Sequence, residues 1–281
     1  MTVFECYNTT KQRLKAAGIE DYVFEAKQIL RFVTKLTNAQ IIEKYNDQID
    51  NLTYYLLDCT VKQRCKRYPL QYILGEWEFY GLRFLVGEGC LAPRADTETL
   101  VDAANEFLSK NTTASVLDLC AGSGCIGITL AARNSDINVT LVEKYDVPYT
   151  YCTRNITAHT LKNAVAVQDD IFTYTTDKRF DLIVSNPPYI SADEMCLLNE
   201  EAKGEPETAL YGGEDGLDYY RLILSRYPDL LNQNGMIAVE VGFKQAAAVA
   251  ELFRQAGFSD IGTKKDLNGI ERVVFGTLKT V

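Results

Sequence analysis

The sequence predicts an α/β protein in which a small helical region precedes a mostly parallel, doubly wound sheet. Two observations predict this fold class. From Ser115 onward, short β-branched runs alternate with helical patterns, which is the order of elements in a parallel sheet with crossover helices. Before that point, residues 9–68 show only the helical spacing of apolar residues. No internal repeat or low-complexity linker interrupts either region.

The helical region is predicted from two amphipathic segments. In residues 21–36, DYVFEAKQILRFVTKL, apolar side chains recur at helical spacing. The same spacing appears in residues 51–68, NLTYYLLDCTVKQRCKRY, which end just before Pro69. We therefore expect a helical domain over residues 1–74. A stabilising cap and a module that docks a substrate are equally compatible with this pattern.

A hairpin is expected next. The stretch EFYGLRFLV contains two short aromatic-rich runs about a Tyr-Gly turn, and it leads through GEGCLAPRADTETLVDAANEFL into a helix. We expect a β-hairpin linker over residues 75–95 and a catalytic domain over residues 96–281. The strands expected in that domain are SVLDLC, NVTLVEK, AVAVQDD, FDLIVS, GMIAVEV and ERVVFGT, with helices after the first strand and over 146–159, 217–231 and 244–256.

Composition excludes several classes of protein. No apolar run approaches the roughly 18 residues that cross a bilayer, and the first twenty residues have no signal-peptide core, so a cytoplasmic protein is expected. The eight cysteines form no CxxC pair and His159 is the only histidine, so no metal site and no disulfide framework are expected. Any Ser-His-Asp mechanism would have to use His159, which lies in a plain helical pattern.

The net charge of −9 is unevenly distributed. Residues 1–95 carry 13 Lys and Arg against 11 Asp and Glu, whereas the remainder carries 16 against 27. A protein that binds nucleic acid gains most of its affinity by neutralising phosphates. The acidic main body therefore argues against a nucleic-acid substrate.

A glycine loop follows the first expected strand. Gly122, Gly124 and Gly127 satisfy GxGxxG, and Glu143 closes the second strand about 20 residues later. Small residues let the backbone approach a nucleoside, and the acid accepts hydrogen bonds from ribose hydroxyls. Because any adenosine-carrying cofactor uses these two features, the loop alone leaves a nicotinamide cofactor and S-adenosylmethionine equally open.

Two acids favour S-adenosylmethionine. Asp118 stands before the loop with the acid-x-x-x-Gly-x-Gly spacing that resembles motif I of class I methyltransferases, where it orders the loop and lies near the cofactor's ammonium. The third strand ends in Asp169 and Asp170, and Asp170 is placed to accept from an adenine amino group. A helix N-cap is the alternative role for Asp170.

The stretch NPPY, residues 186–189, follows the fourth strand. A planar amide or base nitrogen is a poor nucleophile because its lone pair is delocalised. Such a nitrogen needs two hydrogen-bond acceptors that aim its lone pair. Asn186 offers a side-chain carbonyl, Pro187 a backbone carbonyl that is held by rigid prolines, and Tyr189 a flat face. The sequence thus predicts that Asn186, Pro187 and Tyr189 are catalytic, although Asn-Pro is also a common strand terminator.

These stretches together resemble the PrmC/HemK family, the N5-glutamine methyltransferases of class 1 peptide chain release factors. NPPY is shared with DNA adenine methyltransferases, so the ADTE segment together with EPETAL is the more specific sign. The resemblance covers nearly the whole chain. The matching motifs are YPLQYILGEWEFYGLRFLV, LAPRADTETLV, DLCAGSGCIGI, SNPPYI, GEPETALYGGEDGLDYY and DLNGIERVVFG.

The resemblance implies a class I, Rossmann-like methyltransferase fold and assigns site residues. Asn186, Pro187, Pro188 and Tyr189 would hold the substrate glutamine. Ala95 replaces the usual proline of the family, and Ile171 stands where some members have an aromatic residue over the adenine. The residues expected to bind S-adenosylmethionine are Asp118, Cys120, Ala121, Gly122, Ser123, Gly124, Glu143, Asp170, Ile171 and Asn186.

The resemblance also implies the partner, which is the glutamine of the Gly-Gly-Gln loop in a class 1 release factor, with the helical domain docking that factor. No membrane and no nucleic-acid substrate are expected. Two alternatives remain, namely a glutamine of a ribosomal protein and a base nitrogen of adenine or guanine in nucleic acid. A regulatory module without activity would require a broken motif, and every motif residue is present.

Overall fold

The computed structural model describes residues 1–110 and 113–278, which form two compact units. The helical unit consists of Met1–Gly75 together with Asn199–Gly204. The sheet unit consists of Glu76–Leu198 and the chain from Glu205 onward. The helical unit therefore contains a short segment from the second half of the sequence.

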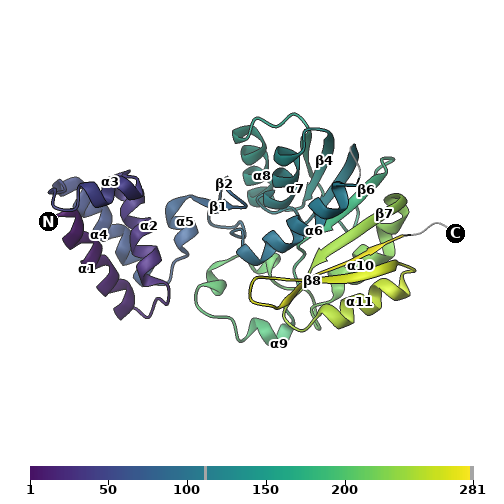
Figure 1. Cartoon of the computed structure of the whole chain (residues 1–281). Helices are drawn as coiled ribbons and strands as arrows, with labels where there is room; N and C mark the ends of the chain where they lie inside the picture. The colour runs from purple at the N-terminus through teal and green to yellow at the C-terminus, as the bar shows by residue number, and fades with distance from the viewer. Residues whose placement is uncertain (111–112, 279–281) are drawn as a thin grey trace. The chain divides into compact units, whose positions relative to one another are not determined.

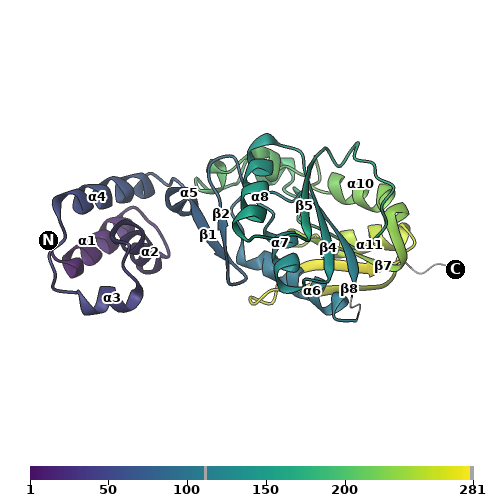
Figure 2. The ribbon, with the colours of Figure 1, turned by 90° about the horizontal axis from the view of Figure 1, so that it is seen from above.

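Five helices build the helical unit. Its three long helices pack against one another (Figure 2) around Leu14, Ile29, Leu30 and Val61, which are fully buried. Reciprocal hydrogen bonds of Thr2 with Glu5 cap the first helix, as the first turn leaves backbone N–H groups without helical partners. The helices are α1 (Val3–Ala16), α2 (Tyr22–Thr34), α3 (Asn38–Glu43), α4 (Asn51–Cys65) and α5 (Leu70–Leu74).

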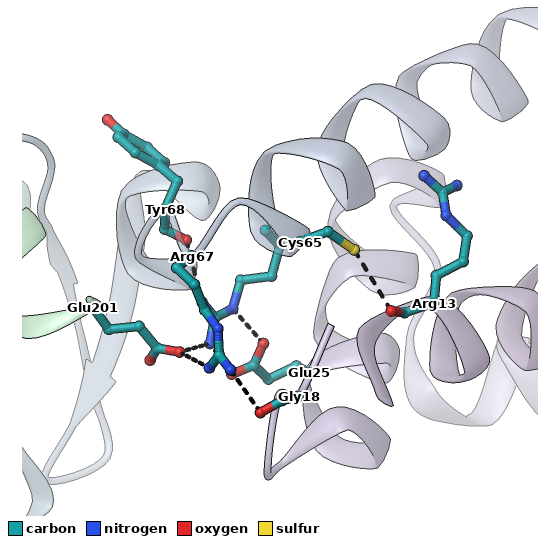
Figure 3. A network of polar contacts seen from close by, with 8 residues as sticks. Arg13, Gly18, Glu25, Cys65, Arg67, Tyr68 and Glu201 are labelled. Carbon is teal, nitrogen blue, oxygen red and sulfur yellow. Dashed lines mark hydrogen bonds and ion pairs between the residues drawn. The ribbon is translucent and has the colours of Figure 1, made fainter. Parts of the chain in front are cut away.

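An ion-pair network centred on a buried arginine lies inside this unit (Figure 3). The side chain of Arg64 on α4 is 2% exposed and donates to both carboxylate oxygens of Glu25 on α2, at 2.6 and 2.8 Å. It also donates to Glu201 at 2.9 Å, and Arg67 donates to the same oxygen at 3.0 Å. Glu201 lies in the segment Asn199–Gly204, so these ion pairs attach that segment to the helices.

The predicted hairpin is confirmed, and it lies in the sheet unit. Strands β1 (Glu76–Phe79) and β2 (Leu82–Leu85) pair in antiparallel register. Tyr80 and Gly81 connect them with φ of +53° and +76°. Two positive φ values are the geometry of a two-residue type I′ turn, whose twist matches that of the strands.

A seven-stranded sheet forms the centre of the sheet unit, in the order β5-β4-β3-β6-β7-β9-β8. Strands β3 to β7 run parallel, and β9 pairs antiparallel with β7 and β8. The predicted doubly wound sheet is confirmed, and β6 lies beside β3 as expected. The strands are β3 (Ala114–Leu119), β4 (Ile137–Glu143), β5 (Ala164–Gln168), β6 (Phe180–Ser185), β7 (Leu231–Glu240), β8 (Ser259–Lys265) and β9 (Glu271–Thr277).

Helices cover both faces of the sheet (Figure 1). On one face, α6 and α7 share a core with the hairpin, and α8 packs on β5. On the other face, α10 and α11 cover a second core. The helix predicted over 217–231 ends at Arg226, because Pro228 cannot continue the α-helical hydrogen bonds. These helices are α6 (Glu98–Leu108), α7 (Cys125–Arg133), α8 (Asp146–Ala158), α10 (Asp218–Arg226) and α11 (Ala246–Gln255), and a short α9 (Ala192–Met195) follows β6.

The eight cysteines are free thiols, and Cys6, Cys90, Cys125 and Cys152 are buried. The only histidine has a structural place. The Nε2 atom of His159 lies 2.8 Å from the carbonyl oxygen of Arg83, and its ring packs 5.3 Å from that of Phe84. His159 therefore ties the end of α8 to the hairpin. Within residues 1–110 and 113–278, no helix is long and apolar enough to span a bilayer.

Candidate functional site

A pocket opens in the sheet unit beyond the C-terminal ends of β3, β4 and β6. This is the edge at which doubly wound sheets bind ligands. Of the residues expected at the site, it is lined by Cys120, Gly122, Glu143, Asp170, Ile171, Asn186 and Pro188. The other expected residues, Asp118, Ala121, Ser123, Gly124, Pro187 and Tyr189, do not line it.

The glycine loop forms one wall of the pocket. Gly122 and Gly124 have φ of +56° and +82°, so both positions use a backbone conformation that favours glycine. A Cβ on Gly122 would meet nothing within 4 Å, whereas one on Gly124 would lie 2.7 Å from Ile128. Gly122 therefore leaves room for a ligand to approach the backbone, and Gly124 allows the loop to pack on α7.

Asp118 lies under this loop and is fully buried. Its Oδ2 accepts from the Gly127 N–H at 2.8 Å, but Oδ1 has no partner in the described part of the chain. Burial raises the pKa of the carboxyl to about 7, against the lowering effect of the Gly127 N–H. A buried carboxyl with one unpaired oxygen favours the approach of a donor, and above all of a cation.

Glu143, at the end of β4, is tied to the same loop. Its Oε2 accepts from the Gly122 N–H at 2.8 Å and its Oε1 from the Tyr145 N–H at 2.9 Å. Burial raises the pKa of Glu143, and these N–H groups oppose the shift. Each carboxylate oxygen has a second lone pair, so Glu143 retains the capacity to accept from a diol in the pocket.

Asp170 and Ile171 form the wall beyond β5. Burial alone would raise the pKa of Asp170, but its ion pair with Lys144 at 2.8 Å and a backbone N–H bring it below its ordinary value. Ile171 is 3% exposed. Tyr219 on α10 also lines the pocket, with its ring against Phe172. An aromatic side chain from a distant helix is therefore present in the pocket although Ile171 is aliphatic.

NPPY forms the third wall, directly after β6. The Nδ2 of Asn186 donates to the hydroxyl of Thr97 at 3.3 Å. No residue within 1–110 or 113–278 donates to its Oδ1. The carbonyl of Tyr189 accepts from Gln245 at 2.9 Å, and its hydroxyl lies 3.4 Å from Glu240. Asn186 thus has one end of its amide engaged and the other end available.

The segment after NPPY packs backbone against backbone with Gly212 and Gly216. A Cβ on Gly212 would lie 2.6 Å from Cα of Tyr189, and one on Gly216 would lie 2.4 Å from its carbonyl oxygen. The chain at 210–212 also exchanges hydrogen bonds with Ile190. The glycines of the GEPETALYGGEDGLDYY stretch therefore allow a close backbone approach that fixes the end of the motif.

Several contributors to the site were missed by sequence reasoning. Buried Asn155 on α8 accepts from the Leu85 N–H at 2.7 Å and donates to the carbonyl of Ser123 at 2.9 Å, which joins the hairpin to the glycine loop. No local pattern distinguishes this asparagine from others in a helix. Other lining residues missed by sequence reasoning are Gly89, Leu91, Val142, Lys144, Tyr145, Pro148, Pro206, Thr208, Ala209 and Tyr219.

Comparison with known proteins gives the family. The family model called PrmC N-terminal domain matches residues 5–75, and the family model called Methyltransferase small domain matches residues 97–200. A release factor glutamine methyltransferase of Geobacter sulfurreducens is 38% identical over 278 residues, which cover 99% of this chain and 97% of that protein. This chain belongs to the release factor glutamine methyltransferase family. The family resemblance read from the motifs is confirmed.

A second relative and two solved structures agree with this assignment at the level of family and of fold. The release factor glutamine methyltransferase of Thermodesulfovibrio yellowstonii is 37% identical over 89% of this chain and 90% of its own. Among solved structures, a methyltransferase from Pyrococcus furiosus superposes with a TM-score of 0.53 at 18% identity, covering 72% of this chain and 91% of that one. It supports the methyltransferase fold alone. An rRNA methyltransferase from T. thermophilus, solved with AdoMet and guanosine, has a TM-score of 0.50 at 20% identity, covering 73% of this chain and 50% of that one.

Proposed function

We propose that this protein transfers the methyl group of S-adenosylmethionine to the side-chain amide nitrogen of the glutamine in the Gly-Gly-Gln motif of class 1 release factors. The observation that carries the proposal is the amide of Asn186. Its nitrogen donates to Thr97 and its oxygen is left for a donor in the pocket. A substrate amide has two N–H donors and needs such acceptors. The names of the relatives supply the release factor.

The residues of the pocket fit S-adenosylmethionine. Bound there, the cofactor supplies an electrophilic methyl group on its sulfonium. Glu143 would accept from the ribose hydroxyls and Asp170 from the adenine amino group, while Asp118, which is buried under the glycine loop and is not part of the pocket wall, would supply a counter-charge for the ammonium of the amino-acid end. The unpaired Oδ1 of Asp118 and the open space before Gly122 support this assignment. Cys120, Ala121, Ser123 and Gly124 would shape the loop around it.

The chain's own contribution to the chemistry is orientation. The neutral amide nitrogen of glutamine is too weak an acid for a general base to help. Oδ1 of Asn186 and the carbonyl of Pro187 would each accept one N–H, so that the lone pair of the nitrogen points at the methyl group. Pro188 and Tyr189 would enclose the amide plane. Orienting two reactants is worth about 7–11 kcal/mol of a reaction barrier.

We also propose that the helical unit docks the release factor. On α4, Leu52, Tyr55 and Leu56 stand at helical spacing and are 67%, 63% and 47% exposed. Large apolar side chains gathered on one exposed helix face are typical of an interaction surface. A release factor is the partner that the relatives' names indicate.

The docking role is tested by replacing Leu52, Tyr55 and Leu56 together with alanine in the full chain. We expect the KM for the release factor to rise while the affinity for S-adenosylmethionine stays unchanged. Val165→Ala, which removes an exposed apolar side chain on β5, is the control. Deleting residues 1–70 is a poorer test, because it also removes Arg64 and Arg67, the partners of Glu201. Unchanged methylation kinetics in the triple variant would exclude this surface.

The substrate is tested by methyl transfer from labelled S-adenosylmethionine to a panel. The panel contains a release factor, the same factor with its Gly-Gly-Gln glutamine replaced, total ribosomal protein, RNA and DNA. Label that appears on the intact factor and is lost with the glutamine supports the proposal. Label on ribosomal protein or nucleic acid would leave the proposed site residues in place, but it would show that the substrate is not a release factor. Because release factors act in translation, we place the protein in the cytoplasm.

A further inference from the structure

The two prolines of NPPY cannot hold the motif in place by their own backbone donors. Proline has no N–H, so neither Pro187 nor Pro188 can donate a main-chain hydrogen bond. The ring fixes φ in each of them, but the position of the pair depends on what holds the residues on either side. The carbonyl of Pro187, which is one of the two proposed acceptors, is therefore placed by the two ends of the motif.

The N-terminal end of the motif is held by the sheet. Ser185, the last residue of β6, pairs with Leu119 on β3 and with Val239 on β7. Its side chain is fully buried, and its hydroxyl donates to the carbonyl of Leu119 at 2.7 Å. Asn186 therefore follows a residue that is fixed by a strand on each side.

The C-terminal end is held by the side-chain amide of Gln245, which lies between β7 and α11. Its Nε2 donates to the carbonyl of Tyr189 at 2.9 Å and to that of Gly216 at 3.4 Å. Its Oε1 accepts from the Gly242 N–H at 2.9 Å. One side chain therefore joins three segments, which are the end of NPPY, the loop at Gly216 and the turn that follows β7.

The partners of the Gln245 amide fix the way it faces. A backbone N–H can only donate and a backbone carbonyl can only accept, so the amide oxygen must face Gly242 and the nitrogen must face Tyr189. The backbone N–H of Gln245 also donates to the carbonyl of Gly242 at 3.1 Å, which closes the turn. The packing is tight, because a Cβ on Gly242 would lie 2.7 Å from Oε1 of Gln245 and 3.0 Å from Cδ2 of Tyr189.

We propose that Gln245 is a positioning residue that holds the C-terminal end of NPPY, so that the amide of Asn186 and the carbonyl of Pro187 reach the substrate nitrogen together. With one end fixed by the sheet and the other by Gln245, the rigid prolines between them have little freedom to shift. Ile190 also bonds to residues 210–212, but these bonds leave the carbonyl of Tyr189 without a donor. The inference rests on the proposed function and adds a residue on which its acceptors depend.

The test compares two substitutions that each keep one half of the Gln245 amide. Gln245→Glu has the same shape and can still accept from Gly242, but an ionised carboxyl cannot donate to Tyr189. Gln245→Lys can donate to Tyr189 but cannot accept from Gly242. We expect kcat for release-factor methylation to fall about ten- to a hundredfold in Gln245→Glu, the loss typical of a misplaced reacting group. Gln245→Lys should recover most of it.

Two controls separate positioning from loss of fold. Gln233→Glu adds the same charge at an exposed position near the start of β7 and should leave kcat unchanged. The Kd for S-adenosylmethionine and the KM for the release factor should stay at their wild-type values in the Gln245 variants, because the glycine loop, Glu143 and the helical unit are untouched. If Gln245→Glu binds no cofactor, Gln245→Met, which has neither donor nor acceptor, replaces it in the comparison with Gln245→Lys.

The outcomes also separate the inference from the proposed function. A Gln245→Lys variant that is no faster than Gln245→Glu would overturn the inference, since the donor to Tyr189 would then not matter. If the wild-type protein labels no glutamine, the proposed function fails and the inference fails with it. If the wild type labels the glutamine and Gln245→Glu does so equally well, only the inference fails.

Discussion

The helical unit and the sheet unit both bury ionisable side chains, but they pair them differently. In the helical unit, Arg64 is matched by the carboxylates of Glu25 and Glu201, with every donor–acceptor distance between 2.6 and 2.9 Å. In the sheet unit, Asp118 and Glu240 each retain one oxygen without a hydrogen bond from the described residues. Both lie at the edge of the sheet that carries the pocket.

The difference separates two uses of a buried charge. A buried ion pair in which both charges are matched is costly to break, because removal of one partner leaves the other charge buried and uncompensated. An acid with an open oxygen has a raised pKa and responds to a ligand or a neighbouring donor. The paired network therefore holds a segment of chain in place, whereas the open acids mark the part of the molecule where a substrate or cofactor is expected.

The strongest test of the comparison is Arg64→Met. The change leaves Glu25 buried without its partner, so we expect the free energy of unfolding to fall by about 3–5 kcal/mol, the usual cost of breaking a buried pair. Urea unfolding followed by circular dichroism measures it. Lys62→Met, which removes an exposed partner of Asp58 on the same helix, is the control and should leave the free energy of unfolding nearly unchanged. Equal losses in the two variants would mean that the Arg64 network is not structural.

Asn186→Ala should leave the fold intact and remove the acceptor. Because an unpaired donor costs about 1–3 kcal/mol and orientation is lost as well, we expect kcat to fall by roughly two decades or more. Steady-state kinetics with a release factor measure the change. Asn138→Ala, an exposed asparagine near the start of β4, is the matched control. Activity within a few-fold of wild type would remove Asn186 from the mechanism.

Asp118 should make cofactor binding depend on pH. Its pKa is raised to about 7 by burial, so the free protein holds a neutral carboxyl below that pH and an ionised one above it, and the proposed role beside an ammonium requires the ionised form. For a ligand that requires the ionised form, the Kd should tighten about tenfold between pH 6 and pH 8. Calorimetric titration with S-adenosylmethionine measures it. The same tightening in Asp118→Asn would assign the effect to another group.

Tyr219 should give the smallest effect, because it offers a neutral ring rather than a charge. A stacked or edge-on aromatic contact is worth about 0.5–1.5 kcal/mol beyond its buried area. Tyr219→Leu should therefore weaken S-adenosylmethionine binding by about two- to tenfold. Tyr54→Leu, an exposed tyrosine of the helical unit, is the control. An unchanged Kd would leave Ile171 as the only hydrophobic contact proposed for the adenine.

Local sequence patterns were sufficient to predict the strands of the parallel sheet, the tight turn of the hairpin and the place of the motif after its strand. The parallel strands, the hairpin turn at Tyr80 and Gly81 and the position of NPPY after β6 follow from periodicity and turn chemistry. Strand β8, SDIGTKK, was missed because it lies at the sheet edge and has little hydrophobic alternation. Its existence depends on its neighbour β9 rather than on its own residues.

The site was only partly predictable, for a similar reason. Glu143 ends β4 and Asn186 directly follows β6, and the sequence pattern indicates where those strands end. Thr97, Asn155 and Tyr219 lie on helices or turns far along the chain, and only the folded arrangement brings them to the loop and the motif. The attachment of Glu201 to α4 also joins residues that are 137 positions apart.

The most direct measurement is tandem mass spectrometry of a class 1 release factor after reaction with the wild-type protein and S-adenosylmethionine. We expect a single added methyl group on the side-chain nitrogen of the Gly-Gly-Gln glutamine, which forms roughly two decades more slowly when Asn186→Ala replaces the wild type. A methyl group on any other atom of the factor, or an unmodified factor, would contradict this expectation.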